Sequence, residues 1–548
     1  MQEFDVIVVG GGISGGIPAA TYLQKAGASV ALIESRHELG TFIPTNEPFP
    51  GAISSPHAAI NFSGAAPAWD DLDLERYGYK IVIGPTIFGI TGKDGKNCIV
   101  YYDSRKTAES FGRHSEKDGR TIEKIQNRIV GNLVEFNELL VYSPPTPERL
   151  EKLWNFSAWV FDVSPDDFRT MNGIELLEET FESDYARRTL ITLPSLNLMG
   201  DVMARGQGAA TIVFDLVYTS AQAVGGNHSL AHAMTRVFLE NGGTVLRNCP
   251  VERIIVQNGK AVGVDLTPDA AYPHKTLYAR QAVISNVGAV KTLELVGEGV
   301  MQSIDARLWA KMKYWKTDFR ASTVSNWVLK GHPRWKSAAW DPDIQKAHLL
   351  YRAWDSWEHC KVWHEAFKSQ DRERVIGGLG EILDFAVVDP SQMSPEGYVV
   401  IRCEEAMPLH WRREGKGLDY WDDAKPMLKQ RRDDLFEELA PGWKEQVVQH
   451  DYYSPLDLWR YNPVAVYGQV IGGDFSEDQW YLDRMPYRMP VHNLYMSNNV
   501  WPLALSWMAP GYNAASIVAT EMGIRNQAWW KGRPCEYFLR NLPNIMVD

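Results

Sequence analysis

The stretch FDVIVVGGGISGGIPAATYLQKAGASVALIE, residues 4–34, decides the fold. It begins with a short apolar run, residues 5–9, which predicts a buried parallel strand. A glycine-rich turn follows, then a segment with helical periodicity and a second apolar run, residues 29–33. This order is typical of two parallel strands joined by a helix, so we expect an α/β fold with a Rossmann-like domain.

The glycines of the turn meet separate physical requirements. Gly10 permits a tight turn, Gly12 lets the backbone approach a pyrophosphate, and Gly15 lets the helix pack on the strand. The helix N-terminus adds unpaired N–H groups that attract phosphates. Glu34 follows about 20 residues later, where a carboxylate accepts the ribose hydroxyls. Such an acid disfavours a 2′-phosphate, so FAD or NAD fits better than NADP.

The bulk composition limits the class of protein. A chain of 548 residues exceeds one hydrophobic core, so we expect two intertwined domains. The net charge of −12 argues against nucleic acid as a partner. No apolar run reaches the ~20 residues of a spanning helix, and no signal peptide precedes the first strand. We therefore expect a cytoplasmic protein, with a peripheral membrane contact left open. The scattered cysteines predict no disulfide framework: Cys98, Cys249, Cys360, Cys403 and Cys535.

Two later segments also have clear patterns of helices and strands. Residues 224–266 predict a helix and then two strands joined by Asn258 and Gly259, a strong hairpin signal. A further strand is expected over residues 281–285. Residues 494–523 predict a strand, a loop and a helix lined with small residues.

These segments, in this order, resemble the FAD-dependent phytoene desaturase-like family, within the amine oxidase and glutathione reductase-type flavoproteins. Blocks such as DLDLERYGYKIVIG, GGNHSLAHAM, VERIIVQNGKAVGV and DRMPYRMPVHNLYMSNNVWP carry the resemblance over most of the chain. The resemblance implies FAD as cofactor, held by these three separated segments of the chain. It implies contacts to FAD from Gly10, Gly12, Ser14, Gly15, Glu34, Ser35, Val251, Asn286, Asn498, Gly511 and Tyr512.

The same resemblance implies the domain organisation. The FAD-binding domain is expected to be discontinuous and interleaved with an α+β substrate-binding domain that has a helical part. The expected FAD-binding pieces are residues 1–80, 215–300 and 451–525; the expected substrate-binding pieces are residues 81–214 and 301–450, and residues 526–548 form a C-terminal tail. Within the substrate-binding part, residues 122–145 predict one amphipathic helix ended by prolines.

The sequence departs from the family at two places that border the flavin in relatives. The usual Gly-Gly-Arg reads Gly40-Thr41-Phe42, and the glycine-rich loop before the last helix reads PLALSW, residues 502–507. Large side chains near this loop are expected to shape a substrate cavity, with plain core packing as the alternative. They are Trp501, Leu503, Leu505 and Trp507.

Three residues are candidates for a catalytic role. His57 and His228 lie where the family's chain passes near the flavin, and either could relay a proton, with a structural hydrogen bond as the alternative. Tyr512 is the third candidate. We recognise no metal-binding constellation and no acyl-transfer motif, so we expect no metal ion.

The resemblance implies an FAD-dependent dehydrogenase or desaturase acting on an apolar, isoprenoid-like or alicyclic substrate. A hydride would pass from an activated C–H bond of the substrate to the flavin. A proton would leave the adjacent carbon, and a double bond would form between the two carbons. Capture by water would give an alcohol, as in limonene dehydrogenases of this kind. The alternatives are a redox-neutral polyene isomerase, a flavin amine oxidase and a non-catalytic prenyl-binding protein of the Rab GDP-dissociation inhibitor type. The electron acceptor (oxygen, a quinone or a protein) and a homo- or hetero-oligomeric state stay open.

Overall fold

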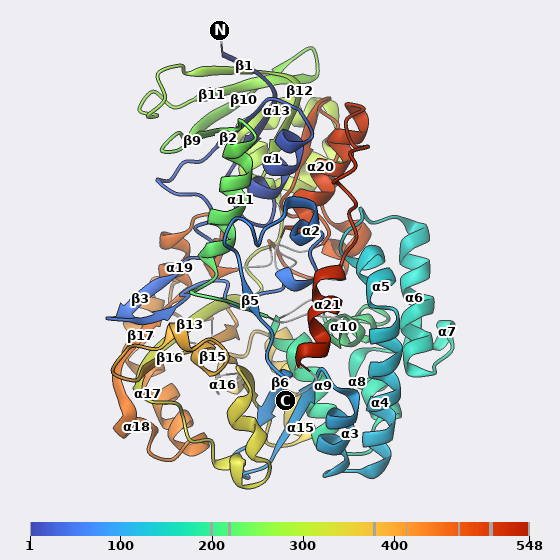
Figure 1. Cartoon of the computed structure of the whole chain (residues 1–548), viewed down its shortest axis with the longest axis vertical. Helices are drawn as coiled ribbons and strands as arrows, with labels where there is room; N and C mark the ends of the chain where they lie inside the picture. The colour runs from blue at the N-terminus through green and yellow to red at the C-terminus, as the bar shows by residue number, and fades with distance from the viewer. Residues whose placement is uncertain are drawn as a thin grey trace.

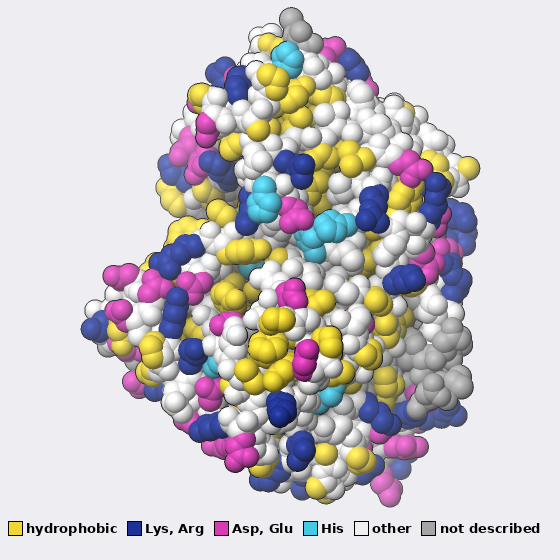
Figure 2. Space-filling model, turned by 60° about the vertical axis from the view of Figure 1, so that its left-hand side comes forward, with side chains coloured by type: hydrophobic (Ala, Val, Ile, Leu, Met, Phe, Trp, Pro, Cys, Tyr) yellow, Lys and Arg dark blue, Asp and Glu magenta, His cyan; other side chains and the backbone are white. Residues whose placement is uncertain are grey.

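Two large β-sheets and a helical region make up the molecule. In Figure 1 the first sheet lies at the top, and the helical region lies at the lower right. The structure is a computed structural model that describes residues 2–197, 201–216, 221–375, 380–412, 414–469, 472–502 and 508–545. Acidic and basic side chains are interspersed over the face drawn in Figure 2, as the small net charge relative to chain length leads one to expect.

The first sheet is built from strands far apart in sequence, in the order β10-β11-β12-β1-β2-β9, with β18 paired to β12. Its four parallel pairings join β12 to β1, β1 to β2, β2 to β9, and β12 to β18. The strands are β1 (Gln2–Val9), β2 (Val30–Ile33), β9 (Thr244–Leu246), β10 (Val251–Gln257), β11 (Lys260–Leu266), β12 (Thr276–Ser285) and β18 (Leu494–Met496).

The local predictions for this sheet are confirmed. The first strand, helix and second strand are β1, α1 (Gly16–Lys25) and β2. Strands β10 and β11 form an antiparallel hairpin, and Asn258 and Gly259 between them both have positive φ, as a two-residue hairpin turn requires. The helix predicted within residues 494–523 is α20 (Ala509–Glu521), which starts close to Gly511 and packs along α1, while α11 (His228–Glu240) packs on another side of α1.

The second sheet has the order β17-β13-β16-β15-β14-β6-β7 and, apart from β17, is almost wholly buried. Only the pairing of β14 with β6 is parallel among the pairings of this sheet in the described residues. Its strand β17 runs through residue 450, where a domain boundary was expected. The strands are β6 (Thr86–Thr91), β7 (Asn97–Tyr101), β13 (Ala321–Lys330), β14 (Leu349–Arg352), β15 (Glu381–Asp384), β16 (Tyr398–Met407) and β17 (Val447–Tyr453).

The helical region follows β7 and lies beside the second sheet (Figure 1). The single amphipathic helix expected over residues 122–145 is two helices, α4 (Glu116–Gly131) and α5 (Leu133–Leu140). They are separated at Asn132, where the backbone leaves the helical conformation directly after a glycine. The other helices here are α3 (Ser104–Gly112), α6 (Pro147–Phe161), α7 (Pro165–Thr170), α8 (Gly173–Thr180), α9 (Asp184–Asn197) and α10 (Gln207–Leu216).

Further strands and helices connect and cover the two sheets. Strands β3 (Asn46–Phe49) and β4 (Ala52–Ser54) pair with each other, as do β5 (Ile81–Val82) and β8 (Gln222–Ala223). The remaining α-helices are α2 (Ala68–Leu72), α12 (Ala289–Val296), α13 (Glu298–Ile304), α14 (Ala306–Lys313), α15 (Trp357–Lys368), α16 (Arg372–Val375), α17 (Tyr420–Leu439), α18 (Trp443–Gln446), α19 (Pro455–Tyr461) and α21 (Glu536–Ile545).

The C-terminal segment packs against the body of the protein. The buried Asp71 accepts hydrogen bonds from the backbone N–H groups of Lys531 and Gly532, at 2.8 and 3.2 Å. In α21, Tyr537 stacks on Trp69 with ring centroids 3.9 Å apart. Among the helices of the described residues, none combines the length and apolar character needed to cross a membrane.

Candidate cofactor site and its surroundings

A cleft of about 500 Å³ opens at the carboxyl ends of the parallel strands. Ligands of open α/β sheets bind at this edge, and the volume lies in the usual range for ligand sites, about 300–1,000 Å³. Residues from all three predicted segments meet here. The predicted cofactor residues that line the cleft are Gly10, Gly12, Ser14, Glu34, Ser35, Val251, Asn286 and Asn498.

The glycine-rich turn has the backbone geometry that its sequence predicts. Gly10 has φ of +95°, a region that residues with a side chain rarely adopt. A Cβ on Gly15 would lie 2.0 Å from Asn286 Oδ1 and 2.3 Å from the Ser497 carbonyl oxygen, so no side chain fits between helix α1 and the strand ends. Gly15 therefore supports the turn from behind and does not line the cleft.

Helix α20 begins against the same turn. The Gly511 N–H donates to the Ser14 carbonyl oxygen at 2.9 Å, and a Cβ on Gly511 would lie 2.2 Å from the carbonyl oxygen of Gly15. The N-termini of α1 and α20 are thereby brought together beside the cleft. Their aligned N–H groups present partial positive charge that suits an anionic pyrophosphate.

Glu34 is held by backbone groups at the mouth of the cleft. Its Oε2 accepts from the Gly11 N–H at 2.8 Å, and its Oε1 accepts from the Arg36 N–H at 2.9 Å. A carboxylate retains further acceptor capacity in this arrangement, so it can also accept ribose hydroxyls. Arg36 lines the cleft as well, but its guanidinium donates to the Tyr461 carbonyl oxygen and lies 4.8 Å from the centroid of the Tyr461 ring. The cleft thus fits a dinucleotide without a 2′-phosphate.

Two asparagines tie the strand ends together. In the amide orientation that pairs donors with acceptors, Asn286 accepts from the Gly16 N–H and donates to the Ser497 carbonyl oxygen, each at 3.1 Å. Asn498 donates from Nδ2 to the Asn286 carbonyl oxygen at 3.1 Å. Both side chains fix the turn, α1 and the end of β18 relative to one another. A direct contact of either with the cofactor stays a prediction.

Tyr512 lies in α20 and does not line the cleft. Its ring packs edge-on against Tyr22, with ring centroids 5.2 Å apart, and its hydroxyl accepts from Arg525 Nη2 at 3.4 Å. Burial raises the pKa of Tyr512. The structure therefore places this phenol under the C-terminal segment, against α1, and a catalytic role for it has no support from its position.

His57 is buried directly behind the wall of the cleft. Its ring packs on Phe42, which lines the cleft, with ring centroids 4.4 Å apart. Its Nδ1 accepts from the Ala58 N–H at 3.0 Å, so the neutral ring carries its proton on Nε2, which has no hydrogen-bond partner among the described residues. Burial lowers the pKa of His57 to about 4, so the ring is neutral at pH 7.

A buried charge cluster, which the sequence analysis missed, lies next to His57. Arg402, in β16, donates to the His57 carbonyl oxygen at 2.8 Å and pairs with both Glu381 and Glu404. Burial raises the pKa of Glu381 to about 7, aided by repulsion from Glu404. Burial opposes ionisation of Glu404 too, but Arg402 and Arg320 outweigh it and lower its pKa. Charged residues inside the apolar strand sequence YVVIRCEEAM were the available signal.

Trp501 lies away from the cleft, in an aromatic cluster beside the helical region. Its indole N–H donates to the Leu140 carbonyl oxygen at 2.7 Å, and its ring contacts Phe214, Trp480 and Tyr481. The other expected cavity residues, Leu503, Leu505 and Trp507, lie outside the described residues.

His228, the remaining catalytic candidate, does not line the cleft. It is the first residue of α11, and its Nε2 lies 2.9 Å from Glu38 Oε1. His232, one turn further along the same helix, approaches the same oxygen at 3.2 Å. The expectation of no metal overlooked this pair, which stands in the sequence as His-x-x-x-His within GGNHSLAHAM.

A second cavity, of about 440 Å³, lies on the side of the second sheet. Its apolar lining includes the aromatic side chains of Phe319, Trp363, Phe367 and Phe475. It also reaches Arg320, which is buried and attracted electrostatically to Glu404 and Glu381. The lining comes from distant segments, so no local pattern predicts the cavity. The one signal in the sequence is a high density of tryptophans, ten of them from Trp309 to Trp421.

Comparison with known proteins places the chain among flavoprotein oxidoreductases. Residues 8–73 match a family described as NAD(P)-binding Rossmann-like domain, and residues 214–302 match a family described as GMC oxidoreductase. A limonene dehydrogenase subunit of Castellaniella defragrans is 24% identical, over 97% of this chain and 96% of that protein. Pyridine nucleotide-disulfide oxidoreductase domain-containing protein 2 of Rattus norvegicus is 24% identical, over 95% of this chain and 94% of that protein.

A solved structure of putrescine oxidase with redesigned cofactor binding superposes with a TM-score of 0.59 at 14% identity, over 96% of this chain and all of that one. The expected α/β fold with a Rossmann-like domain is thereby confirmed. With the cleft described above, the comparisons identify the chain as an FAD-dependent oxidoreductase.

Proposed function

We propose that this FAD-dependent oxidoreductase removes a hydride and a proton from an apolar, terpene-like substrate, in the manner of the phytoene desaturase-like enzymes. The observation that carries the proposal is the similarity to the limonene dehydrogenase chain of Castellaniella defragrans along nearly the whole of both proteins. The aromatic lining of the second cavity supports it, because such surfaces bind apolar molecules.

The second cavity is our proposed path for the substrate. A continuous series of contacts and charges links it to the cofactor cleft: Arg320 at the cavity, the Arg402 cluster, His57 and Phe42. When bound, FAD supplies the hydride acceptor. The chain holds it at the strand ends, excludes water with aromatic side chains, and keeps Glu381, with a pKa of about 7, as a buried group able to accept a proton at neutral pH.

The charged residues of the second cavity argue for a neutral substrate over an amine. A cationic substrate is attracted to a site with excess negative charge, but here Lys and Arg outnumber Asp. The basic residues are Lys316, Arg320, Lys368 and Arg412, and the acidic ones are Asp201, Asp318 and Asp474. The amine oxidase alternative therefore rests on fold alone.

Anaerobic titration of the purified flavoprotein tests the proposal. Terpene hydrocarbons such as limonene are expected to bleach the flavin absorbance, while primary amines and polyenes leave it oxidised. Bleaching by amines alone would favour the amine oxidase, and conversion of a polyene without net bleaching would favour the isomerase. A protein that stays colourless after incubation with FAD would overturn the proposal in favour of a prenyl-binding protein.

We further propose that the chain works with a second, different chain, since the relative from Castellaniella defragrans is named as one subunit of its enzyme. Light scattering of the purified chain, alone and with candidate partner chains from the same source, measures the assembly. Turnover with oxygen, a quinone or a one-electron protein acceptor then identifies which acceptor the complex uses.

A further inference from the structure

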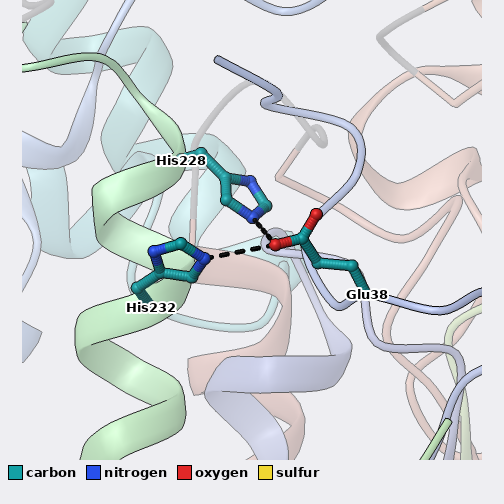
Figure 3. A group of neighbouring side chains, drawn as sticks. All are labelled: Glu38, His228 and His232. Carbon is teal, nitrogen blue, oxygen red and sulfur yellow. Dashed lines mark hydrogen bonds and ion pairs between the residues drawn. The ribbon is translucent and has the colours of Figure 1, made fainter. Parts of the chain in front are cut away.

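A three-residue cluster outside the cofactor cleft has the composition of a metal site. His228 and His232 come from the start of α11, and Glu38 comes from the loop that follows β2 (Figure 3). Both histidine Nε2 atoms point at Glu38 Oε1, at 2.9 and 3.2 Å. All three ligand atoms lie within 4.8 Å of one another. Side chains from two separate segments therefore converge on one point.

The spacing of these atoms fits a small divalent cation. Histidines four residues apart lie on one face of a helix, so both rings can reach the same ion. Tetrahedral Zn²⁺ with bonds of about 2.0–2.2 Å holds its ligand atoms roughly 3.4 Å apart. The two observed nitrogen–oxygen distances are slightly shorter than this, so small side-chain rotations would open room for the ion. A nitrogen–nitrogen–oxygen set suits zinc and neighbouring transition metals.

The surroundings favour a ligand over a plain ion pair. His228 is only 8% exposed, and neither of its ring nitrogens makes a well-aligned hydrogen bond within the described part of the chain. Its ring also packs edge-on against His232, with centroids 4.5 Å apart. The side chains of Glu38 and His232 are 42% and 57% exposed to solvent. An ion can therefore enter from solvent and retain water as a fourth ligand.

The cluster lies where a metal would act on the cofactor cleft. Gly40 follows Glu38 closely in sequence, and a Cβ on it would lie 2.4 Å from the Cβ of Ala231, so this loop is pressed against α11. The same loop continues to Thr41 and Phe42, which line the cleft. Cross-linking Glu38 to α11 would therefore hold one wall of the cleft in place.

We propose that Glu38, His228 and His232 form a binding site for one divalent transition-metal ion, of which zinc is the best fit, and that the ion clamps the loop of residues 35–43 to α11. The proposal is independent of the substrate, because it concerns the loop and not the reacting centre.

Metal binding to the chelator-treated, FAD-loaded protein tests this inference. Zn²⁺ alone, titrated in competition with a chromophoric chelator, is expected to bind with a stoichiometry of one. Co²⁺ is expected to give the visible absorption bands of a four-coordinate site. Zn²⁺ should also raise the thermal unfolding midpoint of the holoprotein, because an ion that binds only the folded state stabilises it.

Variants locate the site. His232→Ala and Glu38→Gln each remove a partly exposed ligand and are expected to weaken Zn²⁺ binding at least about tenfold, while the flavin spectrum reports that the fold is kept. His37→Ala removes an exposed histidine of the same loop that does not belong to the cluster, and it should bind Zn²⁺ as the parent does. Absence of stoichiometric binding in the parent, or equal affinity in His232→Ala and His37→Ala, would overturn the proposal.

Discussion

The cofactor cleft and the interior of the second sheet are built from opposite materials. The cleft is shaped by backbone groups and small side chains: Gly10 and Asn286 line it, and Gly15 packs directly behind them. The second sheet instead buries full charges, with Arg402 between Glu381 and Glu404. At the cleft, close packing leaves almost no room for an added atom. In the second sheet, removal of one charged side chain leaves its oppositely charged neighbours buried without a partner. Each region should therefore fail under a different kind of substitution.

Removing the central charge of the second sheet should have the largest effect on stability. Arg402→Met keeps the size of the side chain but leaves Glu381 and Glu404 buried without the cation that pairs with both of them. Breaking a buried pair in this way costs about 3–5 kcal/mol. The free energy of unfolding, measured with denaturant, is expected to fall by about that amount.

Two controls separate charge balance from packing. Arg76→Ala breaks an exposed pair with Glu240 and should change stability by less than about 1 kcal/mol. Replacing Arg402 and Glu381 together by apolar residues of similar volume removes one charge of each sign and leaves Glu404 with the buried Arg320, so this double variant should restore part of the lost stability. A double variant as unstable as Arg402→Met would contradict the charge explanation.

A single methyl group should produce the next largest effect, this time directly behind the cleft. In Gly15→Ala the new Cβ would lie 2.0 Å from Asn286 Oδ1, so the strand ends and α1 must separate. Overpacking of this kind costs about 1–3 kcal/mol, and we expect the purified variant to hold much less flavin per chain than the parent. Gly112→Ala, in α3, meets no atom within 4 Å and should keep its full flavin content. Equal flavin content in both variants would show that the close packing at Gly15 is dispensable.

The contrast between the regions also explains what the sequence reveals. The turn at Gly10, the acid at Glu34 and the hairpin at Asn258 depend on neighbours within a few residues or on one strand–helix–strand unit, so local pattern predicts them. Arg402 meets Glu381 and His57 only through tertiary pairing of distant segments, and nothing local predicts those partners. The break between α4 and α5 is partly predictable from the sequence. Gly131 marks a position where a helix is weak, but a glycine alone does not show that the helix ends there.

The catalytic candidates show the same limit. His57 was expected near the flavin because of its place in the chain, and the structure puts it behind Phe42 at the wall of the cleft. His228 and Tyr512 were expected near the flavin by the same reasoning, but neither lines the cleft. Position in a family pattern gives the path of the backbone, while the direction of a side chain depends on its packing.

Neutralising Glu34, the predicted acceptor of the ribose hydroxyls, should weaken binding of FAD without unfolding the protein. In Glu34→Gln the acceptor loses its charge but can still receive the Gly11 N–H. Hydrogen bonds to charged groups contribute about 1.5–3 kcal/mol, so the dissociation constant of FAD should rise roughly 10- to 100-fold. Reconstitution of the apoprotein with FAD, followed by protein fluorescence, measures it. Glu252→Gln, an exposed acid on β10, serves as control, and an equal weakening there would mean that overall charge, not the ribose contact, matters.

The smallest effect we predict is a pH dependence of the free energy of unfolding, which arises from Glu381 in the second sheet. The pKa of Glu381 is about 7 in the folded protein, above its ordinary value of 4.5. Between these two values the folded state binds more protons than the unfolded state, so stability falls as pH rises. The contribution of Glu381 is therefore complete below pH 4.5 and is lost as pH rises through 7. The buried His57, with its pKa lowered to about 4, has the opposite slope between pH 4 and 6.5.

Comparison of the parent with Glu381→Gln isolates this term, because the histidines are the same in both proteins. At pH 5 the parent carries a neutral Glu381, which Gln imitates, whereas at pH 8 the parent carries a buried carboxylate that Gln lacks. The free energy of unfolding of the variant, minus that of the parent, should thus rise by about 1–3 kcal/mol between pH 5 and pH 8. A difference that stays flat over this range would mean that Arg402 keeps both carboxylates ionised, and that the second sheet holds a balanced charge cluster with no proton to exchange.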